Sequence, residues 1–96
     1  MTAFFIATAT IKNAELFSQY GAGAGPTIAA HGGALLIRGE TETVLSGEAS
    51  HQISAVASFP DMERLTSWYH SPEYQALIPL RDSAADMNLV AYSQPS

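Results

Sequence analysis

The segment spanning residues 2–11 constrains the fold more than any other part of this sequence. It is rich in β-branched and aromatic residues and contains no turn residue, which is typical of a β-strand. Alternate side chains of a strand point to opposite faces. Here both alternating sets begin with apolar residues, namely Ala3, Phe5 and Ala7 on one face and Phe4 and Ile6 on the other. A strand that is apolar on both faces is covered on both faces, so we expect a central strand.

A helical pattern follows between residues 13 and 31. Asn13 is a suitable N-cap, and apolar residues then recur at spacings of three and four, as on one face of a helix. The glycine-rich run at residues 21–25 and Pro26 weaken this helix, because glycine has low helix propensity and proline removes a backbone donor. We therefore expect one bent helix or two short helices, ended by the glycine pair at residues 32–33.

The remaining elements follow from alternation and turn residues. Residues 34–38 predict a second strand that extends through residues 40–45, with a bulge or bend at Gly39, and residues 51–59 predict a third. A second helical region begins at Pro60-Asp61, restarts at Ser71-Pro72 and is kinked at Pro79. Residues 87–93 alternate again and predict a fourth strand.

The element order is therefore β-α-β-β-α-β over a single α+β domain of residues 1–96, the ferredoxin-like sandwich. Right-handed crossovers place the first and third strands in the centre and both helical regions on one face of the sheet. The other face is left bare, although the first strand is apolar on both sides. Only 14% of the residues are charged, against about 25% in ordinary globular domains. Both observations predict a homodimer that buries the bare face.

Charge and cysteine content exclude several classes of function. The net charge is −5, and the four basic residues are scattered along the chain. The sequence therefore predicts no binding to nucleic acid or to an anionic membrane. The absence of cysteine excludes thiol nucleophiles and iron–sulfur clusters and is compatible with the cytoplasm. The apolar stretch at residues 3–7 lacks a preceding basic residue and is soon interrupted by Thr8 and Thr10, so we interpret it as a strand and not as a secretory signal.

Several strings along nearly the whole chain resemble one family. They are Tyr20, Pro26, Ala30-His31-Gly32-Gly33, Arg38-Gly39, Val44-Leu45, Phe59-Pro60, Trp68-Tyr69, Ser71-Pro72-Glu73-Tyr74-Gln75 and Arg81. The sequence is similar to the family called domain of unknown function 1330, in the dimeric α+β barrel superfamily. This resemblance implies a dimer but no established reaction. Relatives in the wider superfamily include cofactor-independent monooxygenases, muconolactone isomerases and haem-binding proteins, so the fold alone does not define the function.

The residues suggest few sites for chemistry. The spacing of the three histidines is not that of a metal motif, and the sequence predicts neither a metal nor a cofactor. His31 is the candidate for proton transfer, because histidine titrates near neutrality; the alternative is a histidine that ends a helix. The glycine-rich run lies within a helix, which favours helical flexibility, or close packing of the helix on the sheet, over a phosphate loop.

Five further side chains are candidate ligand-binding residues. They are Arg38, Trp68, Tyr69, Tyr74 and Arg81. An arginine recognises a carboxylate by a bidentate contact, although either arginine could equally pair with a nearby acid on the surface. The aromatic residues could line a pocket or simply form core. Because the second helical region is broken near these residues, we expect a ligand to contact the segment from Trp68 to Arg81.

Two functions remain open from the sequence, together with a structural dimer that has no ligand site. The first is a cofactor-independent enzyme acting on a small apolar or aromatic anion, held by Arg38 or Arg81, oriented by Tyr69 and Tyr74, with His31 moving a proton. The second is a module that binds such a metabolite without reaction. Nothing in the sequence decides whether the protein is an enzyme.

Overall fold

The computed structural model describes residues 2–95. Over these residues the chain forms, in order, β1 (Thr2–Ile11), α1 (Ala14–Ala30), β2 (Ala34–Glu40), β3 (Ile53–Phe59), α2 (Met62–His70), α3 (Pro72–Gln75), α4 (Ile78–Ala84) and β4 (Ala85–Gln94). The strands form one antiparallel sheet in the order β2-β3-β1-β4. The ferredoxin-like α+β fold and the central position of β1 and β3 are thus as predicted from the sequence.

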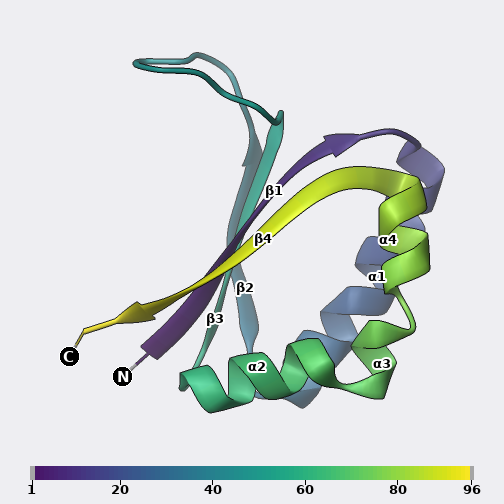
Figure 1. Cartoon of the computed structure of the whole chain (residues 1–96), viewed down its shortest axis with the longest axis vertical. Helices are drawn as coiled ribbons and strands as arrows, with labels where there is room; N and C mark the ends of the chain where they lie inside the picture. The colour runs from purple at the N-terminus through teal and green to yellow at the C-terminus, as the bar shows by residue number, and fades with distance from the viewer. Residues whose placement is uncertain (1, 96) are drawn as a thin grey trace.

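The helices cover one face of the twisted sheet, and no element formed by residues 2–95 covers the other face (Figure 1). On β1, the side chains at positions 3, 5, 7 and 9 are buried beneath the helices. Phe5 stacks on Trp68 of α2, with ring centroids 5.1 Å apart, and Trp68 lies against Tyr74 of α3 at 4.4 Å. These rings form the centre of the core between helices and sheet.

The uncovered side of the sheet, here called the far face, carries an apolar row from all four strands. Ile6 on β1 lies opposite Val56 on β3 and Val90 on β4, and Ile37 on β2 lies opposite Val56. Beside this row, Phe4 lies opposite Tyr92. The alternation of β1 therefore does place apolar residues on both faces of the sheet.

Helix boundaries follow from capping side chains. The Asn13 side chain accepts a hydrogen bond from the backbone N–H of Leu16 at 3.0 Å, and Asp61 caps α2 in the same way at Arg64. Ser71 ends α2 and caps α3 by accepting from the N–H of Tyr74. The restart of the second helical region at Ser71-Pro72 is thus confirmed.

Of the two alternatives predicted for residues 13–31, the structure has a single helix and not two short ones. Helix α1 runs from Ala14 to Ala30 with Pro26 inside it, because the packing of Tyr20, Ala24 and Ile28 against the core outweighs one lost donor. Strand β2 ends at Glu40, and residues 41–52 form a connection that extends beyond the sheet (Figure 1). The predicted extension of this strand through residues 40–45 is therefore wrong beyond Glu40.

The irregularity in β2 also lies elsewhere than predicted. Gly39 pairs regularly with Ser54, whereas the register shifts between Leu35 and Ile37. This bulge leaves Leu36 as the extra residue in the strand. Within residues 2–95, no helix is both long enough and apolar enough to cross a bilayer.

Candidate ligand cavity

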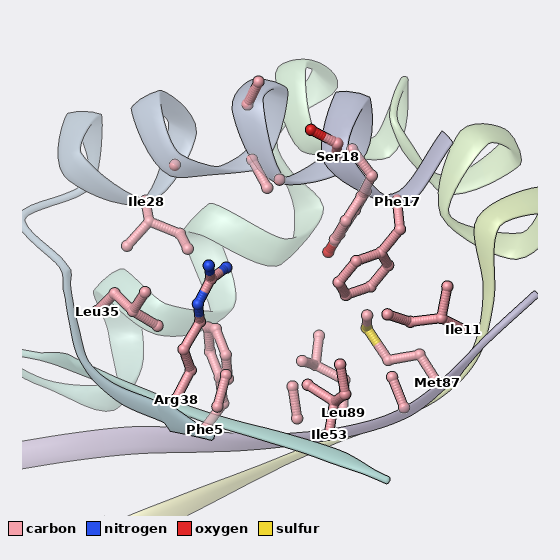
Figure 2. Close-up of a pocket in the computed structure, with 18 of the residues that line it drawn as sticks. Phe5, Ile11, Phe17, Ser18, Ile28, Leu35, Arg38, Ile53, Met87 and Leu89 are labelled. Carbon is pink, nitrogen blue, oxygen red and sulfur yellow. The ribbon is translucent and has the colours of Figure 1, made fainter. Parts of the chain in front are cut away.

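A cavity of about 660 Å³ lies between α1 and the covered face of the sheet (Figure 2). Apolar side chains from every strand and from α1 and α2 make up most of its wall. They include Phe5, Phe17, Ile28, Leu35, Ile53, Trp68, Met87 and Leu89. Ligand pockets in proteins usually occupy about 300 to 1,000 Å³ and are mostly apolar with a few polar groups. The cavity therefore has the size and character of a site for a small organic molecule.

A stripe of small residues on α1 borders this cavity. Ala14, Ser18, Gly21 and Gly25 all line it, and their spacing of four, three and four puts them on one face of the helix. A Cβ atom built at Gly21 or Gly25 would meet no heavy atom within 4 Å. The absence of larger side chains along this stripe is therefore one physical reason that the space remains open.

Gly23 has a different role from the other two glycines of this run. A Cβ there would lie 2.9 Å from Cδ2 of Leu77, between α3 and α4. The close packing expected of the glycine run thus occurs at Gly23, but against the helical layer and not against the sheet. A phosphate loop does not arise here, because the run lies in the interior of α1.

Arg38 is the cationic side chain among the residues that line the cavity. Figure 2 shows it rising from β2 beside Phe5, with its guanidinium group directed towards α1 near Ile28 and Leu35. The other three basic side chains are each within 3.6 Å of an acidic oxygen, in the pairs Lys12–Asp86, Arg64–Asp61 and Arg81–Asp82. Among residues 2–95, Arg38 has no such ion pair. Its positive charge is therefore available to a ligand.

The bulge in β2 determines where Arg38 points. Leu35 pairs with Ala57 on the covered face, and after the bulge it is Arg38, three residues later, that pairs with Ala55 on that same face. Without the extra residue, Ile37 would face the cavity and Arg38 would face outward, because side chains alternate along a regular strand. The bulge thus turns the cation inward and places Ile37 on the far face.

A chain of hydrogen bonds ends at the cavity wall at Tyr20. Arg81 donates through Nη1 to the hydroxyl of Tyr74 at 3.1 Å, and the Tyr74 and Tyr20 hydroxyl oxygens are 2.8 Å apart. Arg81 also donates through Nε to Asp82 at 3.2 Å. Burial raises the pKa of Tyr20, and the neighbouring Tyr74 hydroxyl raises it further. Tyr20 therefore stays protonated at neutral pH.

The histidines lie outside the cavity wall. His31 is the C-cap of α1, and its Nδ1 is 2.9 Å from the carbonyl oxygen of Thr27. His51 bonds to Thr10 at 2.8 Å through Nδ1 and to Asn88 at 3.3 Å through Nε2. Within the described residues, 2–95, no group of three or more histidine and acidic side chains is placed to hold a metal ion.

The structure brings together only part of the site predicted from the sequence. Arg38 and Trp68 line the cavity, whereas Tyr69, Tyr74 and Arg81 belong to the helical layer behind it. Tyr74 is completely buried. Sequence reasoning did not single out Tyr20 as a site residue. Its signals were its place on the inner face of the first helix, which it shares with ordinary core residues, and its presence among the residues that carry the family resemblance.

Comparison with solved structures supports the fold. The chain superposes on the RPA0582 protein of unknown function from Rhodopseudomonas palustris with a TM-score of 0.84 at 18% identity, covering 99% of this chain and 83% of that one. The cofactor-independent oxygenase SnoaB from Streptomyces nogalater gives a TM-score of 0.72 at 10% identity, covering 99% and 94%. A dabb family protein with a ferredoxin-like fold from Mesorhizobium loti gives 0.70 at 14% identity, covering 99% and 98%. These likenesses establish the architecture, and no curated protein matches the chain.

The family is established by sequence. The model of the family described as domain of unknown function (DUF1330) matches residues 2–94, which is nearly the whole chain. The resemblance inferred from the sequence strings is thus confirmed, and this protein belongs to the DUF1330 family.

Proposed function

We propose that the protein binds a small apolar or aromatic anion in the cavity between α1 and the sheet. The observation that carries this proposal is the position of Arg38, a cation without an ion pair among residues 2–95, in an otherwise mostly apolar cavity of about 660 Å³. A guanidinium group recognises a carboxylate or a similar anion through two parallel hydrogen bonds. The apolar wall would bury the remainder of the molecule.

Calorimetric titration with 2-naphthoate tests this proposal. Arg38→Met keeps much of the apolar stem but removes the charge, and we expect about tenfold weaker binding, or more, from the loss of a charge-assisted contact. Arg64→Met is the matched control, because Arg64 is exposed on α2 and pairs with Asp61. Equal affinity of 2-naphthoate for the Arg38→Met variant and the unchanged protein would refute the anion-binding role.

The proposal includes a homodimer formed through the far face. The support is the uncovered apolar row on that face and the description of a structural neighbour from Thermobifida fusca as a dimeric ferredoxin-like protein, with a TM-score of 0.63 at 12% identity. A cytoplasmic location is part of the same proposal and is supported by the absence of cysteine. Neither nucleic acid nor membrane is proposed as a partner.

A cofactor-independent enzyme is the second candidate, and the position of Glu40 favours it. Glu40 follows Arg38 by two residues on β2 and also lines the cavity, so a carboxylate base would lie near a cation able to stabilise the resulting anion. Deuterium exchange of the α-protons of a 1-tetralone carboxylate, followed by NMR, tests this candidate. We expect acceleration that Glu40→Gln abolishes. The predicted roles of His31 and Arg81 are tested by His31→Gln and Arg81→Met in the same assay.

A further inference from the structure

Tyr20 belongs both to the cavity wall and to a buried network of hydrogen bonds. Its side chain lines the cavity, and its hydroxyl oxygen is 2.8 Å from that of Tyr74. Tyr74 and Arg81, the other members of the network, are not among the lining residues. Tyr20 is therefore the member through which the network meets the cavity.

The direction of these hydrogen bonds follows from the chemistry of the three groups. Arginine can only donate, so the Tyr74 oxygen accepts from Arg81 Nη1 at 3.1 Å. If Tyr20 also donated to Tyr74, the Tyr74 hydrogen would need another acceptor. Tyr74 is 0% exposed, and within residues 2–95 no third hydrogen-bond partner of its hydroxyl is found. A buried donor without a partner is costly. Because Tyr20 lines the cavity and Tyr74 does not, only when Tyr74 donates to Tyr20 can the remaining hydroxyl hydrogen reach an acceptor, in a bound molecule.

This direction leaves the hydroxyl hydrogen of Tyr20 without an acceptor among residues 2–95. Tyr20 borders the cavity, where a bound molecule could supply one. Successive hydrogen bonds polarise one another, so the chain from Arg81 through Tyr74 strengthens Tyr20 as a donor. A tyrosine phenol is protonated at neutral pH, and burial raises the pKa of Tyr20 further.

We infer that Tyr20 donates a hydrogen bond to a neutral acceptor oxygen of the ligand, so the preferred ligand carries a carbonyl group in addition to its anionic group. The two polar contacts come from different walls, Tyr20 from α1 and Arg38 from β2. This inference rests on the proposed function and narrows its ligand class to apolar or aromatic keto acids and related molecules. Tyr20 is a specificity-determining residue in this account, and the site discriminates a ketone from the hydrocarbon of the same shape.

Binding of two matched series of probes tests the inference. The positional isomers of 9-oxofluorene-carboxylate and of fluorene-carboxylate have the same flat framework and differ by one carbonyl oxygen. We expect at least one ketone isomer to bind the unchanged protein about five- to tenfold more tightly than its fluorene counterpart, the ratio that one net hydrogen bond gives. Tyr20→Phe should abolish this preference and leave the affinity for fluorene-carboxylate within about twofold. Tyr74→Phe removes the polarising partner and should retain a smaller preference.

The infrared carbonyl band of the bound ketone gives a second, independent readout. It should shift to lower wavenumber in the unchanged protein and lose this shift in Tyr20→Phe, a change that altered packing alone would not produce. If neither series binds although 2-naphthoate does, the inference fails and the proposed function stands; if 2-naphthoate does not bind either, both fail. If both series bind equally, or if Tyr20→Phe retains the full preference and the band shift, only the role of Tyr20 is overturned.

Discussion

The ring of Phe4 stacks on the ring of Tyr92 across two neighbouring strands, with centroids 5.2 Å apart and planes inclined by 17°. The pair lies on the far face, next to the row formed by Ile6, Val56 and Val90. Although its ring is stacked, Tyr92 remains 42% exposed, and Ile37 at the sheet edge is 67% exposed. An apolar surface of this kind is stabilised when a second molecule removes it from water.

The first prediction concerns assembly. Sedimentation at micromolar concentration should give twice the chain mass of 10.2 kDa for the unchanged protein. Ile6→Glu places a charge in the middle of the far face and should give a folded monomer, because burying an unpaired carboxylate costs several kcal/mol. Gln19→Glu adds the same charge at an exposed position of α1 and should stay dimeric. A monomeric unchanged protein would contradict the proposed dimer.

The neighbouring position on β1 should respond differently. Phe5 points to the covered face, is 5% exposed and stacks on Trp68. Phe5→Asp should prevent folding, because the loss of a buried ring and the burial of a carboxylate together match the stability of a small domain, about 5–15 kcal/mol. Circular dichroism should show no cooperative thermal transition. A native-like melting curve would mean that β1 is not central to the core.

A large side chain added on the small-residue stripe of α1 should fill the cavity and abolish ligand binding without lowering the stability of the fold. Gly21→Leu adds a side chain where a Cβ meets nothing within 4 Å, and replacing a helical glycine by leucine contributes up to about 1 kcal/mol. We expect an unchanged or raised melting temperature together with loss of 2-naphthoate binding. Gly33→Ala is the contrasting variant, because its Cβ would lie 2.5 Å from Cε2 of Phe59. Gly33→Ala should lower the melting temperature.

Alkaline pH should destabilise the fold through Tyr20. Burial and the neighbouring Tyr74 raise the pKa of Tyr20 in the folded protein. In the unfolded chain a tyrosine has a pKa of about 10. The unfolded state therefore loses this proton first, and the free energy of unfolding should fall as the pH rises above about 10. Denaturant titrations between pH 8 and pH 11 should show a smaller fall for Tyr20→Phe.

The sequence predicted the fold because its signals were local and mutually consistent. The two-sided apolar pattern of residues 2–11 identified a central strand, and Ser71-Pro72 identified a helix restart that the structure shows in place. Local propensity left open whether residues 13–31 form one helix or two, and packing decides between them. Pro26 lies inside a single α1, because the apolar residues on either side of it are held against the core.

The cavity could be predicted only in part, because it depends on how far α1 stands from the sheet. The composition identified Arg38 as a candidate anion site, but its inward direction depends on the bulge between Leu35 and Ile37. Alternation of side chains gives no sign of such a bulge. The cavity lies between α1 and the sheet and not at the helix break at Ser71-Pro72. On the side of α1 that faces the other helices, Leu77 packs close to Gly23. The predicted ligand contacts of Tyr69, Tyr74 and Arg81 stay a prediction.

The bulge in β2 also bears on how copies of this protein avoid aggregation. Strand β2 is an edge of the sheet and carries three exposed apolar residues in succession, Leu35, Leu36 and Ile37. A regular edge strand of this composition is a template to which further strands can add without limit. An extra residue within the strand interrupts the spacing of its free backbone groups and increases its local twist. The irregularity that turns Arg38 inward therefore also hinders the pairing of this edge with the edge of another molecule.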